Sequence, residues 1–229
     1  MNIEGLNKVT LLDYPGKVAC TIFTGGCDLR CPFCHNSPLV FHPNSSPMDP
    51  DEILAFLRKR RGVLDGVAIT GGEPLLQHDI ADFLGLVKEM GYKIKLDTNG
   101  NHPEQLEGVV SLGLVDCVAM DIKNSPDRYA QTVGIPDFDI GNILVSKDFL
   151  MNSGIDYEFR TTAVREFHSR EAFGGIADFI RGAKKYYIQN FVDSGALIQN
   201  GLHGFSADEM NEFLDIVKPA AEVTGLRGV

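Results

Sequence analysis

The sequence alternates short apolar segments with longer amphipathic ones, and this order constrains the fold more than any other feature. Six short segments are rich in β-branched or aromatic residues, as strands are. They cover residues 18–23, 66–70, 93–98, 117–122, 157–164 and 186–192. Helices are expected over residues 48–60, 78–91, 102–113, 140–152, 169–185 and 206–218. Strands that alternate with helices form βαβ units with parallel strands and right-handed crossovers.

Several of the expected helices carry signals for their ends. Asp49 can cap the N-terminus of one helix, and Pro50 suits its first turn. Ser206 and Glu209 have the spacing of a capping box. Gly91 follows an amphipathic segment and suits a helix C-terminus. These signals support the alternation and set the positions of the loops.

Six βα units give an α/β fold, either a doubly wound sheet or a barrel that is incomplete. Periodicity does not separate these two, but both place functional loops beyond the carboxyl ends of the strands. The first four strands are followed or ended by "GGCDLRCPFC", "GGEP", "DTNG" and "DIK". We therefore expect these loops to converge on one rim and to form one active site. A length of 229 residues suits one domain over residues 1–229, although two small domains also fit.

The charge and hydropathy of the chain argue against some classes of partner. The net charge is −10, whereas nucleic-acid binding requires clustered Lys and Arg. The basic segment 58–61 ends an expected helix, where cations favour the helix dipole. No apolar run is long enough to span a membrane, and the N-terminus lacks a signal pattern. We expect a cytoplasmic protein in which thiols stay reduced.

Three of the five cysteines form a C-x3-C-x2-C pattern at Cys27, Cys31 and Cys34. Cys20 and Cys117 lie in apolar strands, where buried small hydrophobic residues are expected. Thiolates select zinc or iron–sulfur clusters, and structural zinc requires four protein ligands. A four-iron cluster normally also has four thiolates. Three thiolates leave one metal position open for a substrate or cofactor.

The segment "DYPGKVACTIFTGGCDLRCPFCHN", with Phe33 just before the third cysteine, resembles the radical S-adenosylmethionine (SAM) superfamily. Within it, the segment resembles the glycyl-radical-enzyme activases, and most of all those of anaerobic ribonucleoside-triphosphate reductase. The pyruvate formate-lyase activating enzymes are more distant. The likeness extends over about residues 12–192. It implies a partial (β/α)6 barrel with its core at about 18–192, a cysteine loop at 24–38 and a C-terminal helix at about 206–218.

The resemblance also implies a chemistry. Cys27, Cys31 and Cys34 would hold a [4Fe–4S] cluster, and the methionine part of SAM would chelate the fourth iron. One electron, from a donor such as flavodoxin or ferredoxin, would cleave SAM to methionine and a 5′-deoxyadenosyl radical. For an activase, this radical takes a hydrogen atom from a backbone glycine of a partner glycyl radical enzyme.

The motif "GGEP" has two interpretations. Taken alone, two glycines after a strand are most often a plain turn. The resemblance implies that Gly71, Gly72 and Glu73 contact the amino group of SAM. Phe33 likewise either packs the cysteine loop or shields the cluster and the adenine of SAM from water.

Two carboxylates, Asp97 and Asp121, are expected at neighbouring strand ends, where they repel unless a cation or a shared proton compensates. The resemblance implies a monovalent cation at Asp97, Thr98 and Asp121. It also implies that Lys123 meets the carboxylate of SAM. Arg160 lies in an apolar strand, so it is expected either in an ion pair or in contact with SAM.

Two histidines and the end of the sixth strand have open roles. His35 follows the third cysteine and is expected to orient the loop. His168 begins a helix and is expected to be solvated or to point to the rim. The resemblance would place a SAM-contacting histidine after the last barrel strand, but this chain has none there. Gln189, Asn190 or Asp193 are the candidates to replace it.

Three functions are compatible with the sequence. The leading one is a radical SAM activase that acts on a partner protein. The second is a small-molecule radical SAM enzyme similar to the 7-carboxy-7-deazaguanine synthases, which requires a clamp for the substrate carboxylate and a magnesium site. The third is a ferredoxin-like electron carrier or a zinc-stabilised binding module, which requires a fourth protein ligand.

Overall fold

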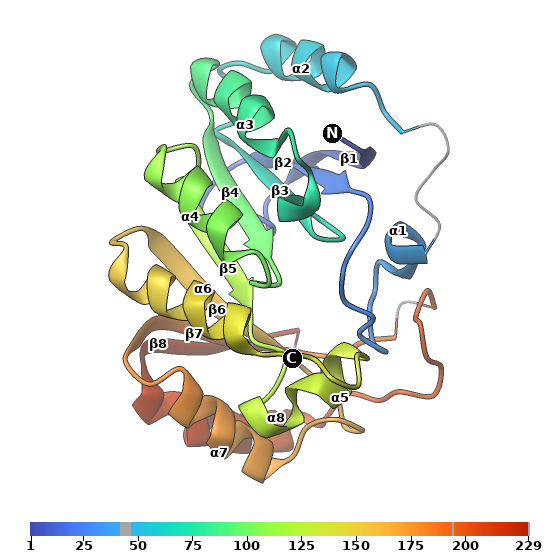
Figure 1. Ribbon diagram of the computed structural model, residues 1–229, viewed down its shortest axis with the longest axis vertical. Coiled ribbons are helices and arrows are strands. Elements are labelled where there is room, and N and C mark those ends of the chain that lie inside the picture. Colours follow the sequence, from blue (N-terminus) through green and yellow to red (C-terminus); the bar gives the residue numbers. More distant parts are fainter. Residues whose placement is uncertain (42–46, 194, 229) are drawn as a thin grey trace. The chain divides into compact units, whose positions relative to one another are not determined.

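The computed structural model describes residues 1–41, 47–193 and 195–228 and divides into two compact units. The first unit comprises residues 1–28, 38–98 and 102–118, and the second comprises residues 29–37, 99–101 and 119–229. Figure 1 shows their helices and strands in sequence order. A single domain over the whole chain stays a prediction.

The first unit is built on strands that follow the order of the sequence. They are β1 (Ile3–Thr10), β2 (Ala19–Thr24), β3 (Gly66–Gly71) and β4 (Lys93–Thr98). Strands β2, β3 and β4 pair in parallel, whereas β1 pairs with β2 in the antiparallel sense. The helical elements are α2 (Pro50–Lys59), η1 (Pro74–Leu76), α3 (Ile80–Glu89) and α4 (Pro103–Ser111). The short helix α1 (Ser37–Phe41) follows the cysteine loop. Its first residue, Ser37, belongs to the second unit, and the rest of the helix belongs to the first.

The second unit also runs in sequence order. Its strands are the end of β5 (Cys117–Asp121), then β6 (Asp156–Ala163), β7 (Ala183–Asn190) and β8 (Ala221–Arg227). Strands β6, β7 and β8 pair in parallel. The helical elements are η2 (Pro126–Arg128), α5 (Tyr129–Val133), α6 (Gly141–Asn152), α7 (Arg170–Phe179), α8 (Ala207–Val217) and η3 (Lys218–Ala220).

Each unit has an apolar core between strands and helices. In the first unit, Ile69 of β3 and Leu96 of β4 are fully buried, as is Leu84 of α3. In the second unit, the rings of Phe173 in α7 and Phe213 in α8 stack with their centroids 4.4 Å apart. Apolar burial of this kind is the main stabilising term in folding. It leaves the polar ends of the strands for other roles.

All six expected strands are confirmed, with bounds that differ by up to three residues. The caps are confirmed as well. The side chain of Asp49 accepts a hydrogen bond from the backbone N–H of Asp51 at 2.9 Å. Ser206 and Glu209 form both halves of a capping box.

Two expectations are wrong in detail. The helix expected over residues 169–185 ends at Phe179, and β7 already begins at Ala183. The chain turns at Gly182, whose φ of +88° is available to glycine at little cost. The structure also has strands at both ends of the chain that the sequence pattern did not predict, β1 and β8, and β1 is antiparallel to its neighbour.

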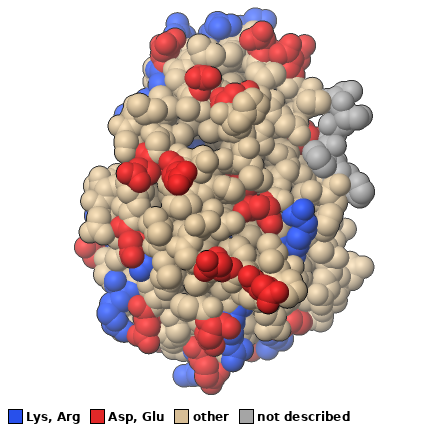
Figure 2. Space-filling view, in the orientation of Figure 1, with Lys and Arg blue, Asp and Glu red and all other residues tan. Residues whose placement is uncertain are grey.

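The surface in Figure 2 carries acidic side chains scattered among uncharged ones, with most of the basic side chains toward its edges. This distribution agrees with the net charge of −10. Within the described residues, no helix has the length and hydropathy that crossing a membrane requires.

Candidate active site

The cysteine loop leaves the carboxyl end of β2. In the first unit, the N–H of Gly26 donates to the carbonyl oxygen of Leu39 at 2.8 Å, and Cys27 follows. In the second unit, the N–H of Cys34 donates to the carbonyl oxygen of Cys31 at 3.0 Å, so the last two cysteines flank a turn. The ring of Phe33 packs on that of Phe167, with centroids 5.8 Å apart. The turn and the ring contact fix this part of the loop.

The "GGE" segment is bound directly to the start of the cysteine loop. The N–H of Gly72 donates to the carbonyl oxygen of Thr24 at 2.9 Å, and the N–H of Glu73 donates to that of Gly26 at 2.8 Å. A Cβ atom on Gly72 would lie 1.8 Å from the oxygen of Gly26. Gly71 has a φ of +123°, and its Cβ would lie 2.3 Å from the nitrogen of Thr24. These glycines therefore allow two loops of the chain to approach each other closely.

Glu73 is fully buried at the end of this segment. Its Oε1 atom accepts hydrogen bonds from the Thr98 hydroxyl at 2.8 Å and from the N–H of Leu75 at 3.1 Å. Two residues expected in different roles, Glu73 and Thr98, are thus in direct contact. A buried carboxylate requires such donors, because burial without hydrogen bonds is costly.

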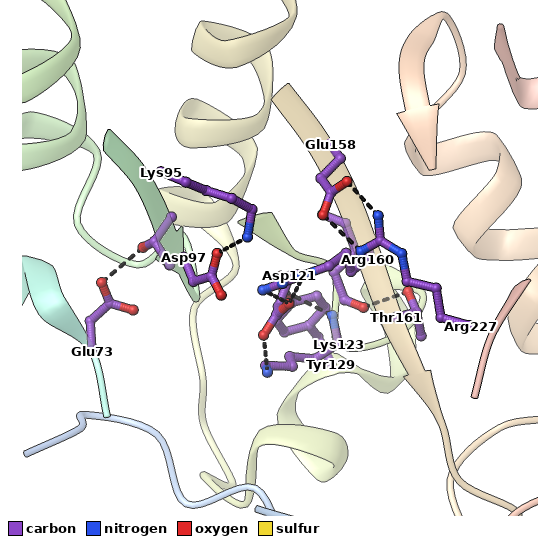
Figure 3. A network of polar contacts seen from close by, with 12 residues as sticks. Glu73, Lys95, Asp97, Asp121, Lys123, Tyr129, Glu158, Arg160, Thr161 and Arg227 are labelled. Carbon is purple, nitrogen blue, oxygen red and sulfur yellow. Dashed lines mark hydrogen bonds and ion pairs between the residues drawn. The ribbon is translucent and has the colours of Figure 1, made fainter. Parts of the chain in front are cut away.

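Asp97 has a partner that the sequence analysis missed. The ammonium of Lys95 forms an ion pair with Oδ1 of Asp97, and its side chain is only 2% exposed (Figure 3). The two residues are two positions apart on β4, so they point to the same face. The alternation of charges at 93, 95 and 97 was the signal for this pair.

Asp121 lies between two cations in the second unit. Its Oδ2 accepts from the Lys123 ammonium at 2.8 Å, and its Oδ1 accepts from Nε of Arg160 at 3.1 Å (Figure 3). Burial opposes ionisation of Asp121, but Lys123 and Arg160 outweigh it and lower its pKa to about 2. Burial likewise opposes the charge of Lys123, and Asp121 outweighs it, so the pKa of Lys123 is raised. The three groups are charged at neutral pH.

The ion pairs of Asp97 and Asp121 bear on the monovalent cation that was expected beside them. Asp97 and Asp121 each have a cationic side chain of their own, so their charges do not by themselves require a bound ion. The monovalent cation at Asp97, Thr98 and Asp121 stays a prediction that depends on the resemblance alone. Arg160 makes the ion pair that was one of its two expected roles.

Cys31 is buried close to this charged group. Burial raises the pKa of its thiol to about 11, and the positive charge of Lys123 opposes this shift. A buried thiol of this kind loses its proton when it binds a metal, because the metal supplies the missing positive charge. None of the five cysteines forms a disulfide bond, and in the described part of the chain no three His, Cys, Asp or Glu side chains are close enough to hold one metal ion. In a four-iron cluster each thiolate binds a different iron atom, so the cysteines of such a site are farther apart than the ligands of a single ion.

A family model described as the radical SAM superfamily matches residues 21–216. The chain belongs to this superfamily. Its members are enzymes that use a [4Fe–4S] cluster and SAM. The C-x3-C-x2-C pattern of the cysteine loop lies within the matched range.

Three relatives are similar to this chain over different shares of its length. The chain is 34% identical over 196 residues to a candidate glycyl-radical enzyme activating enzyme of Methanocaldococcus jannaschii, covering 82% of this chain and 79% of that protein. It is 33% identical over 130 residues to the pyruvate formate-lyase-activating enzyme of Clostridium pasteurianum, covering 55% and 53%. It is 37% identical over 89 residues to the 7-carboxy-7-deazaguanine synthase of Halobacterium salinarum, covering 37% and 34%.

The fold agrees with these matches. The crystal structure of SuiB from Streptococcus suis bound to SAM superposes with a TM-score of 0.70 at 17% identity, covering 89% of this chain and 48% of that enzyme. The expected α/β fold of radical SAM type, with a partial barrel, is confirmed. The chain spans about half of the length of SuiB, so this similarity concerns the fold alone.

The burial of His168 differs from what the sequence predicts. It is buried, with 4% of its surface exposed, and is not solvated. Its Nε2 donates to the carbonyl oxygen of Lys123 at 2.9 Å, and its Nδ1 accepts from the N–H of Val164 at 3.1 Å. The expectation of a solvated side chain was wrong, because the loop after β6 folds inward, which no local sequence signal showed. The other expectation, a side chain that points to the rim, agrees with its contact to Lys123 just after β5.

The three candidates to replace the family's histidine differ in their hydrogen bonds. Asn190 binds the backbone of Phe205 through both its amide oxygen and nitrogen, at 2.9 and 2.8 Å. Asp193 accepts from the N–H of Gly195 at 2.7 Å. Among described residues, none forms a hydrogen bond with the Gln189 side chain, which is half-buried on β7. The replacement of the family's histidine by one of these three residues stays a prediction.

Two histidines, His35 and His102, have partners that no sequence pattern indicated. His35 is exposed and stacks on Phe191, with ring centroids 5.4 Å apart. His102 donates from Nε2 to Oδ2 of Asp28 at 3.1 Å, directly after the first cysteine of the loop. The hydrogen bond to Asp28 raises the pKa of His102.

A second, partly buried ion pair joins β6 and β8. Arg227 donates to both carboxylate oxygens of Glu158, at 2.9 and 2.7 Å (Figure 3). The guanidinium also lies over the Tyr187 ring, 3.9 Å from its centroid. This contact attaches the unpredicted strand β8 to the second unit.

Cys20 is fully buried as expected, whereas Cys117 is only half-buried.

Proposed function

We propose that this protein is a radical SAM activase that installs a glycyl radical on a partner enzyme. The observation that carries the proposal is the 34% identity to a candidate activating enzyme across 79% of that protein's length. The "CHN" and "DYPGK" elements of the sequence favour the same class. The anaerobic ribonucleoside-triphosphate reductase is the partner that the resemblance favours.

Cys27, Cys31 and Cys34 are the proposed ligands of the [4Fe–4S] cluster. They lie within eight consecutive residues, so one cluster can bind all three. The buried Cys31 thiol, with Lys123 as a nearby positive charge, suits a metal-bound thiolate. When bound, the reduced cluster supplies the electron that cleaves SAM to a 5′-deoxyadenosyl radical. Flavodoxin or ferredoxin is the proposed source of that electron.

The proposed SAM contacts divide into two kinds. Gly71, Gly72 and Glu73 form a rigid segment whose buried carboxylate suits the ammonium group of SAM. Lys123 and Arg160 present positive charges that suit its carboxylate. Because both cations are already held by Asp121, they need little reorganisation to bind an anion.

Phe33 has a supporting role in this proposal. Its side chain is 4% exposed and packs on Phe167. An apolar ring beside the last two cysteines excludes water from the cluster, and this tunes a cluster's reduction potential.

A second candidate function is a small-molecule reaction of the type that 7-carboxy-7-deazaguanine synthases perform. The 37% identity to one such synthase favours it, although the matched segment covers only 37% of this chain. A free positive side chain for the substrate carboxylate would be needed besides those that bind SAM. We propose the activase because its similarity covers much more of the chain.

Anaerobic incubation with glycyl radical enzymes tests the proposal. The reconstituted and reduced protein is mixed with SAM and purified anaerobic ribonucleoside-triphosphate reductase, and electron paramagnetic resonance (EPR) follows the reaction. The proposal expects a glycyl radical signal that requires SAM. Cleavage of SAM without such a signal, on this reductase and on pyruvate formate-lyase, would keep the superfamily chemistry and contradict the activase.

A further inference from the structure

We infer that His168 is a positioning residue, which fixes the backbone of Lys123 so that its ammonium group is held for SAM. This inference rests on the proposed function, in which Lys123 contacts the SAM carboxylate. The contacts of His168 are with Lys123, Val164 and Phe173. It acts through the segment that follows β5.

The imidazole of His168 is held in one orientation and one tautomer. The carbonyl oxygen of Lys123 can only accept, so Nε2, at 2.9 Å, carries the proton. Nδ1 is then free to accept from the N–H of Val164 at 3.1 Å. The ring also packs on Phe173, with centroids 5.7 Å apart. Both nitrogens and one face of the ring are engaged, so the ring is well placed to hold its partner.

The backbone of Lys123 is held on both sides. Its N–H donates to the Tyr129 hydroxyl at 3.2 Å, and its carbonyl oxygen accepts from His168. The preceding carbonyl, of Ile122, accepts from the Thr161 hydroxyl at 2.7 Å. The ammonium at the far end of the side chain binds Asp121 at 2.8 Å. With the backbone fixed, the ammonium has a defined position.

The loop that carries His168 is itself anchored beside this segment. The amide nitrogen of Asn124 donates to the carbonyl oxygen of Phe167 at 3.0 Å and to the Thr132 hydroxyl at 2.8 Å. Phe167 also packs on Phe33 in the cysteine loop. The loop after β6 therefore contacts both the Lys123 segment and the turn between the last two cysteines. Loss of the His168 bond would leave the partly buried carbonyl of Lys123 without this donor and loosen this connection.

Two amide substitutions at His168 separate the effect of the hydrogen bond to Lys123 from the effect of a polar side chain. In H168Q the amide nitrogen can reach the place of Nε2, so the bond to Lys123 can be kept. In H168N the side chain is one methylene shorter and reaches only to the level of Nδ1. The two variants carry the same chemical group, so a difference between them reports the bond to Lys123. Tyr129→Phe removes the other support while it keeps the buried ring.

The first measurement needs no cofactor. The cofactor-free protein is treated with an amine-reactive ester, and mass spectrometry gives the labelling rate of Lys123 relative to Lys88, a comparable ion-paired lysine. We expect H168N and Tyr129→Phe to raise the Lys123 rate at least about threefold, with H168Q close to the wild type. Equal rates in H168N and the wild type would overturn the inference.

The second measurement connects the position of Lys123 to SAM. Equilibrium dialysis gives the Kd of the cluster-loaded enzyme for SAM. We expect about a tenfold higher Kd for H168N, and a Kd within about threefold of the wild type for H168Q. A faster labelling of Lys123 with an unchanged Kd would overturn the role toward SAM. If the wild type fails to bind SAM, the proposed function fails, and the labelling rates alone decide whether His168 positions Lys123.

Discussion

The ammonium of Lys123 binds Oδ2 of Asp121 at 2.8 Å, on the oxygen that Arg160 leaves free. One carboxylate thus orders two cations from β6 and from the segment after β5. In the proposed function, both cations face the carboxylate of SAM.

Replacing Asp121 by asparagine should weaken both stability and SAM binding. Lys123 would keep its charge without the carboxylate that neutralises it in a largely buried place, and Arg160 would lose its ion pair with Asp121. We expect the free energy of unfolding of the cofactor-free protein to fall by about 2 kcal/mol, between the values for exposed and buried pairs. Urea denaturation measures this change. D178N, which breaks an exposed pair with Arg181, is the control and should change it by less than about 0.5 kcal/mol.

Replacing Gly72 by alanine should displace the cysteine loop. The new Cβ would lie 1.8 Å from the oxygen of Gly26, which belongs to the backbone and cannot turn away. We expect G72A to retain much less iron after anaerobic reconstitution than the wild type. Gly85→Ala in α3 is the matched control, because a Cβ there meets nothing within 4 Å. Equal iron in G72A and G85A would contradict the role of this close approach.

Each of the three cysteines in the loop should be required for the cluster. We expect C27A, C31A and C34A to lose the iron and the visible absorption of the reconstituted protein. Cys20→Ala is the control, because Cys20 is fully buried in β2 and burial raises its pKa to about 12. C20A should keep its iron and lose about 1 kcal/mol of stability. Iron retained in C31A would contradict the proposed ligand set.

Stability should depend on pH through His168. Burial lowers the pKa of His168 below its ordinary value of 6.5. Below pH 6.5 the unfolded chain therefore binds a proton that the folded chain does not, so the free energy of unfolding falls as the pH falls. We expect this decrease to be smaller in H168Q, measured by urea denaturation of the cofactor-free protein between pH 5 and 7. His78→Gln, at an exposed position, is the control. The same slope in H168Q and the wild type would contradict a buried neutral histidine.

The strands and the motifs after them could be predicted because both depend on local patterns. The six apolar segments and the capping signals follow from side-chain periodicity, and each polar loop lies where its strand ends. The terminal strands could not be predicted in this way. Strand β1 mixes polar and apolar residues, and β8 contains Gly225 and has no fully buried residue. Such strands form because a neighbour offers hydrogen bonds, as β7 does for β8.

The partners of the site residues were harder to predict than the residues themselves. The sequence indicated Asp97 and Asp121, but their cations depend on which side chains share a face. Lys95 was readable from its spacing to Asp97, whereas Arg160 reaches Asp121 from another strand. The burial of His168 depends on a loop contact with Lys123 across 45 positions of the chain. Periodicity carries no information on such contacts.

The EPR spectrum of the reduced, reconstituted protein with and without SAM tests the central claim most directly. A cluster held by three cysteines has one iron open to SAM, so the account predicts that adding SAM changes the spectrum of the wild type. An identical spectrum with and without SAM, or zinc in place of iron in the purified protein, would contradict it.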